Sequence, residues 1–253
     1  MTSSLGDNFF AYRSKHFYLI SQQDERYVSN FLRSLENIYF RVAKVLGDLH
    51  LEDNRRIPII IFPDVECYYE YIAYYYPEEG EFAESGGIFV NDLIPHFAFP
   101  LIEQSAATAV AAHELTHALV SHLPIPTWLN EGLAVNIEST ITGINPFHLS
   151  REKHNKHLSF WGEDEIQEFW SGESFFRVDE ANLLSYQLAQ LITRTLAGNQ
   201  HSFHAFVADA HYDDAGEAAL NKHYGLSLAD VIENVFGEGD WVPQPQKWID
   251  STR

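Results

Sequence analysis

The spacing of apolar residues in the first hundred positions predicts a small sheet and two helices. Three short apolar runs are typical of strands: residues 16–20, 57–62 and 88–90. The third run follows Gly86-Gly87, and we expect it at an edge of the sheet. Residues 24–46 carry apolar side chains three or four positions apart, which predicts a long amphipathic helix. A second, tyrosine-rich helix is expected at residues 68–76, before Pro77.

The second half of the chain has helical periodicity over most of its length. Helices are expected at residues 102–122, from Thr127 to about 138, and at 181–196, 202–210, 215–224 and 228–236. Residues 139–178 have a weaker pattern, in which Trp161 and Trp170 are the expected anchors. Since strands precede helices, we predict the α+β class, with a small N-terminal mixed sheet, a long helix and a helical C-terminal half. The length fits one domain over residues 1–253, divided into an α/β lobe at about 10–122 and a helical lobe at about 127–240.

Composition and charge exclude several classes of function. Hydrophobic residues make up 45% of the 253 positions, so the chain can build a sizeable core. The formal net charge of −20 argues against nucleic-acid binding and against docking to anionic membranes, because both need a basic surface. The sequence has no apolar run long enough to span a bilayer and no N-terminal signal pattern, and its single cysteine allows no intrachain disulfide. We therefore expect a cytoplasmic protein.

The segment His113-Glu114-Leu115-Thr116-His117 has the spacing HExxH within a predicted helix. Four helical residues rotate by about 400° and rise about 6 Å, so both imidazoles lie on one face and can bind one Zn²⁺. Glu114 is turned away from His113 by about 100°, where it can accept a proton from a zinc-bound water without being a ligand. With 13 histidines in the chain, chance alone can produce this spacing, so the assignment needs a third ligand.

Glu131 is the candidate for that third ligand. The pattern HExxHxxGxxH, which would supply a third histidine, is excluded because Val120 and Leu123 occupy the required positions. Instead, a proline-containing turn is followed by a second helix that begins with Thr127 as its expected N-cap. Glu131 lies about one turn into this helix and can face the histidines, which gives a catalytic His₂Glu zinc set. Gly132 beside it is expected to allow close approach of the two helices.

These two segments, HELTHALV and PTWLNEGLA, resemble the gluzincin metallopeptidases, in particular the peptidase MA-like proteins. The resemblance covers about residues 105–140 and implies a zincin-like catalytic domain, zinc and peptide-bond hydrolysis. By the same resemblance, Tyr186 in the sequence Ser-Tyr-Gln-Leu is similar to a tyrosine that stabilises the oxyanion; its alternative role is packing. The segment 86–90 resembles an edge strand that binds substrate backbone, but it lacks the G-x-M-E-N signature of gluzincin aminopeptidases.

The remaining histidines have no clean ligand spacing with a carboxylate, so one metal per chain is expected. His148, His154 and His157 lie in a charged segment and are expected to be solvated. Glu138 lies seven residues after Glu131 on a similar helix face, which fits either a hydrogen-bond partner of a ligand histidine or a surface carboxylate.

Three functions are compatible with this site. The first is a zinc peptidase that cleaves internal bonds in a peptide or protein substrate, with a preference for basic residues because of the acidic charge. The second is a zinc-binding module, non-catalytic or regulatory, which has no need of the base Glu114. The third is a hydrolase of non-peptide amides or esters, which would use the same metal chemistry.

Overall fold

We describe the fold from a computed structural model of the chain. The structure describes residues 9–51, 55–75, 86–90, 93–101, 104–144 and 148–248, and in the fifth range the side chains from Ala107 onward. Two compact units emerge from the contacts between Cα atoms. The first comprises Met1–Ser121 with Ile137–Gly143, and the second comprises His122–Asn136 with Ile144–Arg253.

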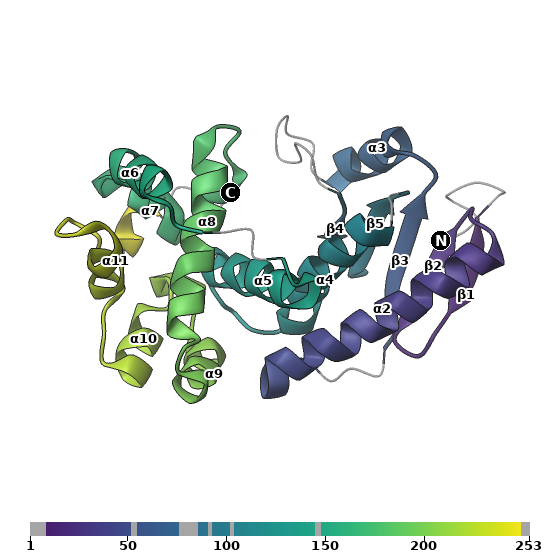
Figure 1. Cartoon of the computed structure of the whole chain (residues 1–253), viewed down its shortest axis with the longest axis horizontal. Helices are drawn as coiled ribbons and strands as arrows, with labels where there is room; N and C mark the ends of the chain where they lie inside the picture. The colour runs from purple at the N-terminus through teal and green to yellow at the C-terminus, as the bar shows by residue number, and fades with distance from the viewer. Residues whose placement is uncertain are drawn as a thin grey trace. The chain divides into compact units, whose positions relative to one another are not determined.

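A five-stranded sheet forms the centre of the first unit (Figure 1). Its strands are β1 (Phe10–Arg13), β2 (Phe17–Ser21), β3 (Ile57–Phe62), β4 (Ile88–Val90) and β5 (His96–Pro100). The spatial order is β1-β2-β3-β5-β4, in which β2, β3 and β5 are parallel and the two outer strands are antiparallel to their neighbours. The sheet is therefore mixed, and β4 lies at its edge, as the sequence predicts.

Strands β1 and β5 are absent from the sequence prediction. The short β1 is mostly exposed and carries no buried run, so it has no apolar signal of its own. In β5 every residue is buried, but the strand begins with a histidine and ends with a proline. His96 is satisfied inside the core by two contacts, one between its Nε2 and the Tyr71 hydroxyl (2.7 Å) and one between its Nδ1 and the Ile94 carbonyl (2.7 Å).

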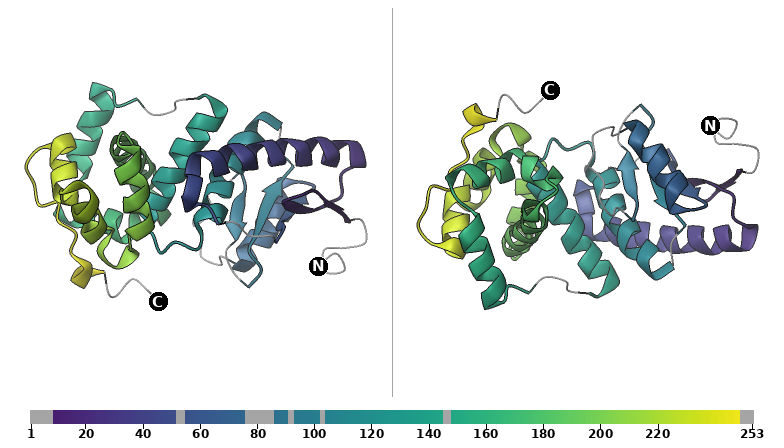
Figure 2. Two further views of the ribbon diagram at one scale, coloured as in Figure 1. Left: turned by 90° about the horizontal axis from the view of Figure 1, so that it is seen from below. Right: turned by 90° about the horizontal axis from the view of Figure 1, so that it is seen from above.

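Helices cover both faces of the sheet (Figure 2). Helix α3 (Val65–Tyr75) packs on the face that carries Ile60, Phe62 and Ala98. On the other face, Phe99 meets the ring of Phe31 from α2 (Glu25–Leu46). Helix α4 (Gln104–Val120) packs beside α2 and β4. Because both faces are covered, the central strands are apolar at successive positions rather than at alternate ones.

The helices of this unit begin and end close to the predicted bounds. The α2 helix has Asp24 as its N-cap, where the carboxylate accepts a hydrogen bond from the Tyr27 amide (2.8 Å). Helix α3 starts three residues earlier than predicted, and the expected last residue, Tyr76, lies outside the described residues, as does Ile102 before α4.

The second unit is helical over the part of the chain that the structure describes. Helix α5 (Thr127–Thr142) begins in this unit and ends in the first. It is followed by α6 (Arg151–Phe160), α7 (Glu163–Ser171), α8 (Glu180–Leu196), α9 (Gln200–Asp209), α10 (Glu217–Tyr224) and α11 (Leu228–Phe236). The predicted α+β class, with a helical C-terminal half, is confirmed. The predicted start of α10 at 215 is wrong because Ala215 has a left-handed backbone, with φ at 56°.

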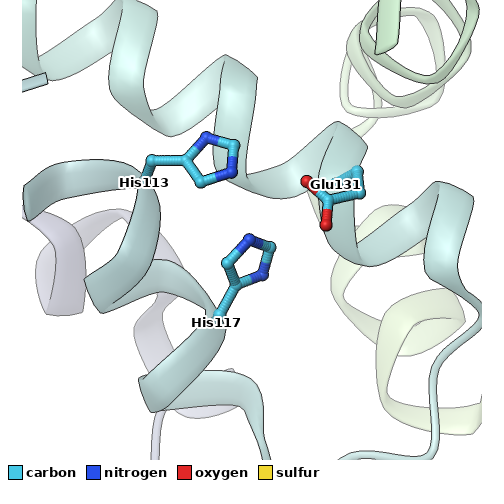
Figure 3. A group of neighbouring side chains, drawn as sticks. All are labelled: His113, His117 and Glu131. Carbon is cyan, nitrogen blue, oxygen red and sulfur yellow. The ribbon is translucent and has the colours of Figure 1, made fainter. Parts of the chain in front are cut away.

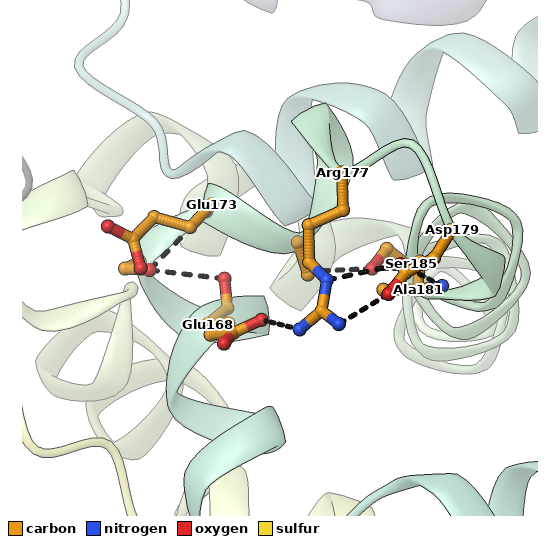
Figure 4. Close-up of polar contacts among 8 residues, drawn as sticks. Glu168, Glu173, Arg177, Asp179, Ala181 and Ser185 are labelled. Carbon is orange, nitrogen blue, oxygen red and sulfur yellow. Dashed lines mark hydrogen bonds and ion pairs between the residues drawn. The ribbon is translucent and has the colours of Figure 1, made fainter. Parts of the chain in front are cut away.

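Residues 139–178, where the sequence pattern is weak, contain α6 and α7 and are held by buried aromatic rings and by one arginine. Trp161 and Trp170 are buried, which confirms the prediction that they are anchors. Arg177 joins α7 to the start of α8, because its guanidinium donates to Glu168 (2.5 Å) and to Asp179 (2.5 Å), the N-cap of α8 (Figure 4). The hydrogen bonds from Arg177 hold the pKa of Asp179 below its ordinary value.

His157 is buried, and the prediction that it is solvated is wrong. Its ring contacts Gln187 through Nε2 (3.1 Å), accepts a hydrogen bond from Trp161 at Nδ1 (2.9 Å) and stacks on Phe236. Its neighbour His154 contacts the Val235 carbonyl and is half-buried, whereas His148 is exposed as expected. The charged sequence around His157 hid this role because its helix, α6, turns only one narrow face inward.

None of the helices among the described residues is long and apolar enough to cross a membrane.

Candidate metal centre

Helix α4 presents His113 and His117 on one face, one turn apart. The rest of the helix is fixed by small and apolar residues, of which Ala112 and Leu115 are completely buried. The two imidazole centroids lie 4.8 Å apart, and both rings are half-buried. The helical spacing predicted from HExxH is therefore present.

Helix α5 supplies Glu131, and the residues just before it explain its place. The Pro126 carbonyl accepts from the amides of Leu129 and Asn130 at 3.0 Å each, so the helix starts directly after the prolines. Thr127 is the first residue of the helix rather than its N-cap, which moves the predicted start by one position. Trp128 is completely buried and donates from Nε1 to the Ala215 carbonyl (3.0 Å), which fixes the first turn of α5 in the C-terminal helical unit.

Gly132 allows α5 to approach another helix closely, but that helix is α8 and not α4. A Cβ atom on Gly132 would lie 2.1 Å from the Thr193 hydroxyl and 2.7 Å from the Ala189 carbonyl, and both of these residues belong to α8. The contact continues one turn later, where the side-chain amide of Asn136 donates from Nδ2 to the Gln190 carbonyl (3.0 Å). The glycine next to Glu131 thus holds α5 against the helix that also carries Tyr186.

His113, His117 and Glu131 form a group that can hold a metal ion. One ligand atom from each residue can be chosen so that all three lie within 4.8 Å of one another. Figure 3 shows both imidazoles and the carboxylate turned toward a common point. In a tetrahedral zinc site, ligand atoms about 2.0–2.1 Å from the metal lie about 3.4 Å apart, so small side-chain rotations bring these three into range. Two imidazoles and one carboxylate, with Oε2 of Glu131 shielded from solvent, are the donors of a catalytic site that keeps a fourth position open.

Glu138 contacts the outer nitrogen of His113. Its Oε2 lies 3.3 Å from Nδ1 of His113, and the two side chains are 31% and 17% exposed. With Nδ1 facing a carboxylate, Nε2 is the ring nitrogen that is available to a metal. Of the two roles that the sequence allows for Glu138, the structure supports the hydrogen-bond partner of a ligand histidine.

Glu114 lies outside the ligand group and is held by the edge strand. Its side chain is nearly buried, and its Oε2 accepts a hydrogen bond from the Phe89 amide of β4 (2.7 Å). Gly87 brings β4 close to α4, since a Cβ atom there would lie 2.2 Å from the Phe99 ring and 2.8 Å from Val110. Glu114 and the strand after Gly86-Gly87 were both singled out from the sequence, but the hydrogen bond between them was not predicted. Its donor is a backbone amide, which residues of almost every type possess.

Tyr186 makes a packing contact on α8, and His122 lies on the surface. Tyr186 lies on α8, is half-buried and has its ring edge-on to Phe175, with 5.2 Å between centroids. Its predicted oxyanion role stays a prediction. His122 is exposed just beyond the end of α4. Among the described residues, the three ligands above form the only group of this kind, and no second metal cluster is found there.

Comparisons with known proteins add no assignment. The chain matches no model of a protein family, and a search of curated protein sequences finds no match.

Proposed function

We propose that this protein is a zinc-dependent metallohydrolase, a peptidase of the gluzincin type that hydrolyses internal peptide bonds. The proposal rests on one observation about α4 and α5. His113, His117 and Glu131 form one group, whereas Glu114 is held outside this group by the Phe89 amide. Zinc is the metal that this donor set favours, because carboxylate and imidazole ligands with an open position are its usual catalytic environment.

Each residue has a defined part in the reaction. A bound zinc ion supplies Lewis acidity and lowers the pKa of a water molecule to about 7. Glu114 accepts the proton of the attacking water and passes it to the leaving nitrogen. The Phe89 amide binds Oε2 of Glu114 and fixes the position of this carboxylate. Glu138 orients His113 through Nδ1.

The edge position of β4 supports an extended substrate. Phe89 is opposite Phe97 in the antiparallel pair, and its amide points away from β5 toward Glu114. The carbonyl of the same residue points to the same outer side, since both groups of a residue face one neighbour in an antiparallel ladder. A substrate backbone that pairs with this carbonyl lies beside Glu114. This pairing does not depend on how far the substrate's termini are from the paired residue. The net charge of −20 further favours basic residues in the substrate at low salt.

Metal analysis tests the ligand group. We expect about one zinc per chain in the purified protein, and a steep loss of zinc in His113→Ala and in Glu131→Ala. His122→Ala is the matched control, because it removes an exposed histidine close to the end of the same helix. Full zinc retention in either ligand variant would contradict the assignment.

Glu114→Gln separates the metal site from catalysis. The variant keeps the size of the side chain and can still accept from the Phe89 amide, so zinc content and fold should be unchanged. The loss of the proton acceptor should lower the rate by about 10²–10⁴. Activity equal to that of the parent protein in Glu114→Gln would rule out catalysis by this site. If neither the parent nor the variant cleaves any substrate, a zinc-binding module is favoured.

A library of peptides with blocked and free termini tests the type of cleavage. We expect cleavage of internal bonds in blocked peptides, and faster cleavage of basic than of acidic peptides at low salt. Release of single residues from free N-termini only would refute the endopeptidase proposal. Turnover of amide or ester substrates without any peptide cleavage would favour the non-peptide hydrolase.

A further inference from the structure

A cavity lies within the first unit, and Phe89, whose amide binds Glu114, is on its wall. It has a volume of about 340 Å³ and lies where β2, β3 and β5 begin. Its wall includes His16 before β2, Ile57 at the start of β3 and Pro95 before β5. Leu119, near the end of α4, lies on the same wall. This volume is in the range of cavities that hold small organic ligands.

His16 is held by a carboxylate at one nitrogen. Its Nδ1 lies 2.6 Å from Oε2 of Glu36, and its ring stacks on Tyr39 at 3.9 Å between centroids. The Ser14 hydroxyl and the His16 amide both donate to Oε1 of Glu36, at 2.6 and 2.8 Å. Burial alone raises the pKa of Glu36, but these hydrogen bonds outweigh it and lower the pKa below its ordinary value. An ionised Glu36 thus fixes Nδ1 as the bonded nitrogen and leaves Nε2 of His16 for a ligand.

Arg56 provides an anchored guanidinium on the same wall. Its Nε donates to the Ser14 carbonyl (2.7 Å), which orients the group, and its two terminal nitrogens are in the fork geometry that matches a carboxylate. Arg55 lines the cavity as well. The chain has only 16 lysines and arginines against 36 acidic residues. Two adjacent arginines therefore give this cavity wall a positive charge, opposite to the net charge of the chain.

The remainder of the wall is largely apolar. Ile94 and Leu93 line the cavity and are 53% and 95% exposed to solvent, so an apolar surface continues to its opening. A ligand that matches both parts has an anionic end for the arginine and histidine and an apolar body for the rest.

We propose that this cavity binds a small carboxylate with an apolar chain, whose carboxylate is held by Arg56 and by Nε2 of His16. The inference goes beyond the proposed function, because neither Arg56 nor His16 belongs to the metal group, although Phe89, which binds Glu114, also lines the cavity. Bound in this way, the ligand accepts hydrogen bonds from the terminal nitrogens of Arg56 and contacts Nε2 of His16, while Glu36 contacts Nδ1 on the opposite side of the ring.

Calorimetric titration with octanoate tests the proposal, with acetate and 1-octanol as probes that have only the carboxylate or only the chain. Octanoate should bind saturably, and the other two at least tenfold more weakly. Arg56→Gln should weaken octanoate binding about tenfold or more, as expected for the loss of a charge-assisted pair. Arg26→Gln is the matched control, because Arg26 is an exposed residue in the first turn of α2 and its loss changes the net charge equally. Equal affinity of the two arginine variants, or of octanoate and 1-octanol, would overturn the proposal.

The same titration in the His113→Ala variant separates this cavity from the metal centre. A carboxylate can also bind a metal ion, so binding at the metal centre would disappear with the ligand histidine. We expect octanoate affinity to be unchanged in His113→Ala. Its loss there would place the ligand on the metal and refute the second site, whatever becomes of the peptidase proposal.

Discussion

Substitution of Gly132 by alanine is the sharpest test of how α5 is positioned. In a helix interior, alanine is more favourable than glycine by about 1 kcal/mol, so propensity alone predicts stabilisation. The structure predicts the opposite. The new Cβ would lie 2.1 Å from Oγ1 of Thr193 and 2.7 Å from the Ala189 carbonyl oxygen, where ordinary contacts begin at 3.4 Å. The helices must therefore separate by about 1 Å or bend locally, and such overpacking typically costs about 1–3 kcal/mol.

A second substitution shows which neighbour causes the effect. Thr193 is buried, and its hydroxyl has no hydrogen-bond partner among the residues that the structure describes. Thr193→Ala therefore removes the closest contact without breaking a hydrogen bond. The Ala189 carbonyl stays in place, so Thr193→Ala should restore only part of the stability that Gly132→Ala loses.

Urea unfolding followed by circular dichroism measures all four proteins of this double-mutant cycle. We expect Gly132→Ala to lower the free energy of unfolding by about 1–3 kcal/mol, with a favourable coupling to Thr193→Ala. Because Glu131 is the adjacent residue, zinc affinity should fall as well. A stabilised Gly132→Ala protein, or effects of the two substitutions that simply add, would refute the close packing of α5 on α8.

Three further predictions follow from single contacts. Glu138→Gln should weaken zinc binding about 10–100-fold in a chelator competition without unfolding the protein, and unchanged affinity would show that the contact with His113 has no role in binding. Burial lowers the pKa of His157 to about 4 from 6.5, so the unfolded state takes up the proton first as the pH falls. The free energy of unfolding should therefore decrease by up to about 3 kcal/mol between about pH 6.5 and pH 4. His157→Gln should flatten this decrease over the same range. An identical pH slope in both proteins would contradict the buried neutral ring. Trp128→Phe leaves the Ala215 carbonyl without its indole donor and should lower the free energy of unfolding by about 1–3 kcal/mol in a thermal unfolding experiment. Tyr27→Phe on α2 is the control, because Tyr27 bonds to Asp24 through its backbone amide and not through its hydroxyl. An equal or smaller loss in Trp128→Phe than in the control would show that the indole bond is unimportant.

The ligand group was predictable from the sequence because its geometry is local. Four residues separate His113 from His117, and a helix of any origin places them on one face. The role of Glu131 could be predicted for a related reason. The prolines before Thr127 restrict the path of the chain, so only a short turn separates the two helices. The order of strands and long helices also follows from local periodicity, and the edge position of β4 agrees with its Gly-Gly start.

The contacts that join distant parts of the chain were decided by tertiary structure alone. The Phe89 amide holds Glu114 across 25 residues, and Glu138 reaches His113 across the same separation. Gly132 was expected to face α4 but faces α8, since residue type shows that a close approach is needed and not which helix makes it. His157 looked solvated because its helix is charged, and only its partners Trp161 and Gln187 make burial possible. Helical spacing is set by bonds within a few residues, whereas a hydrogen bond or packing contact across the fold depends on where the backbone brings its two ends together.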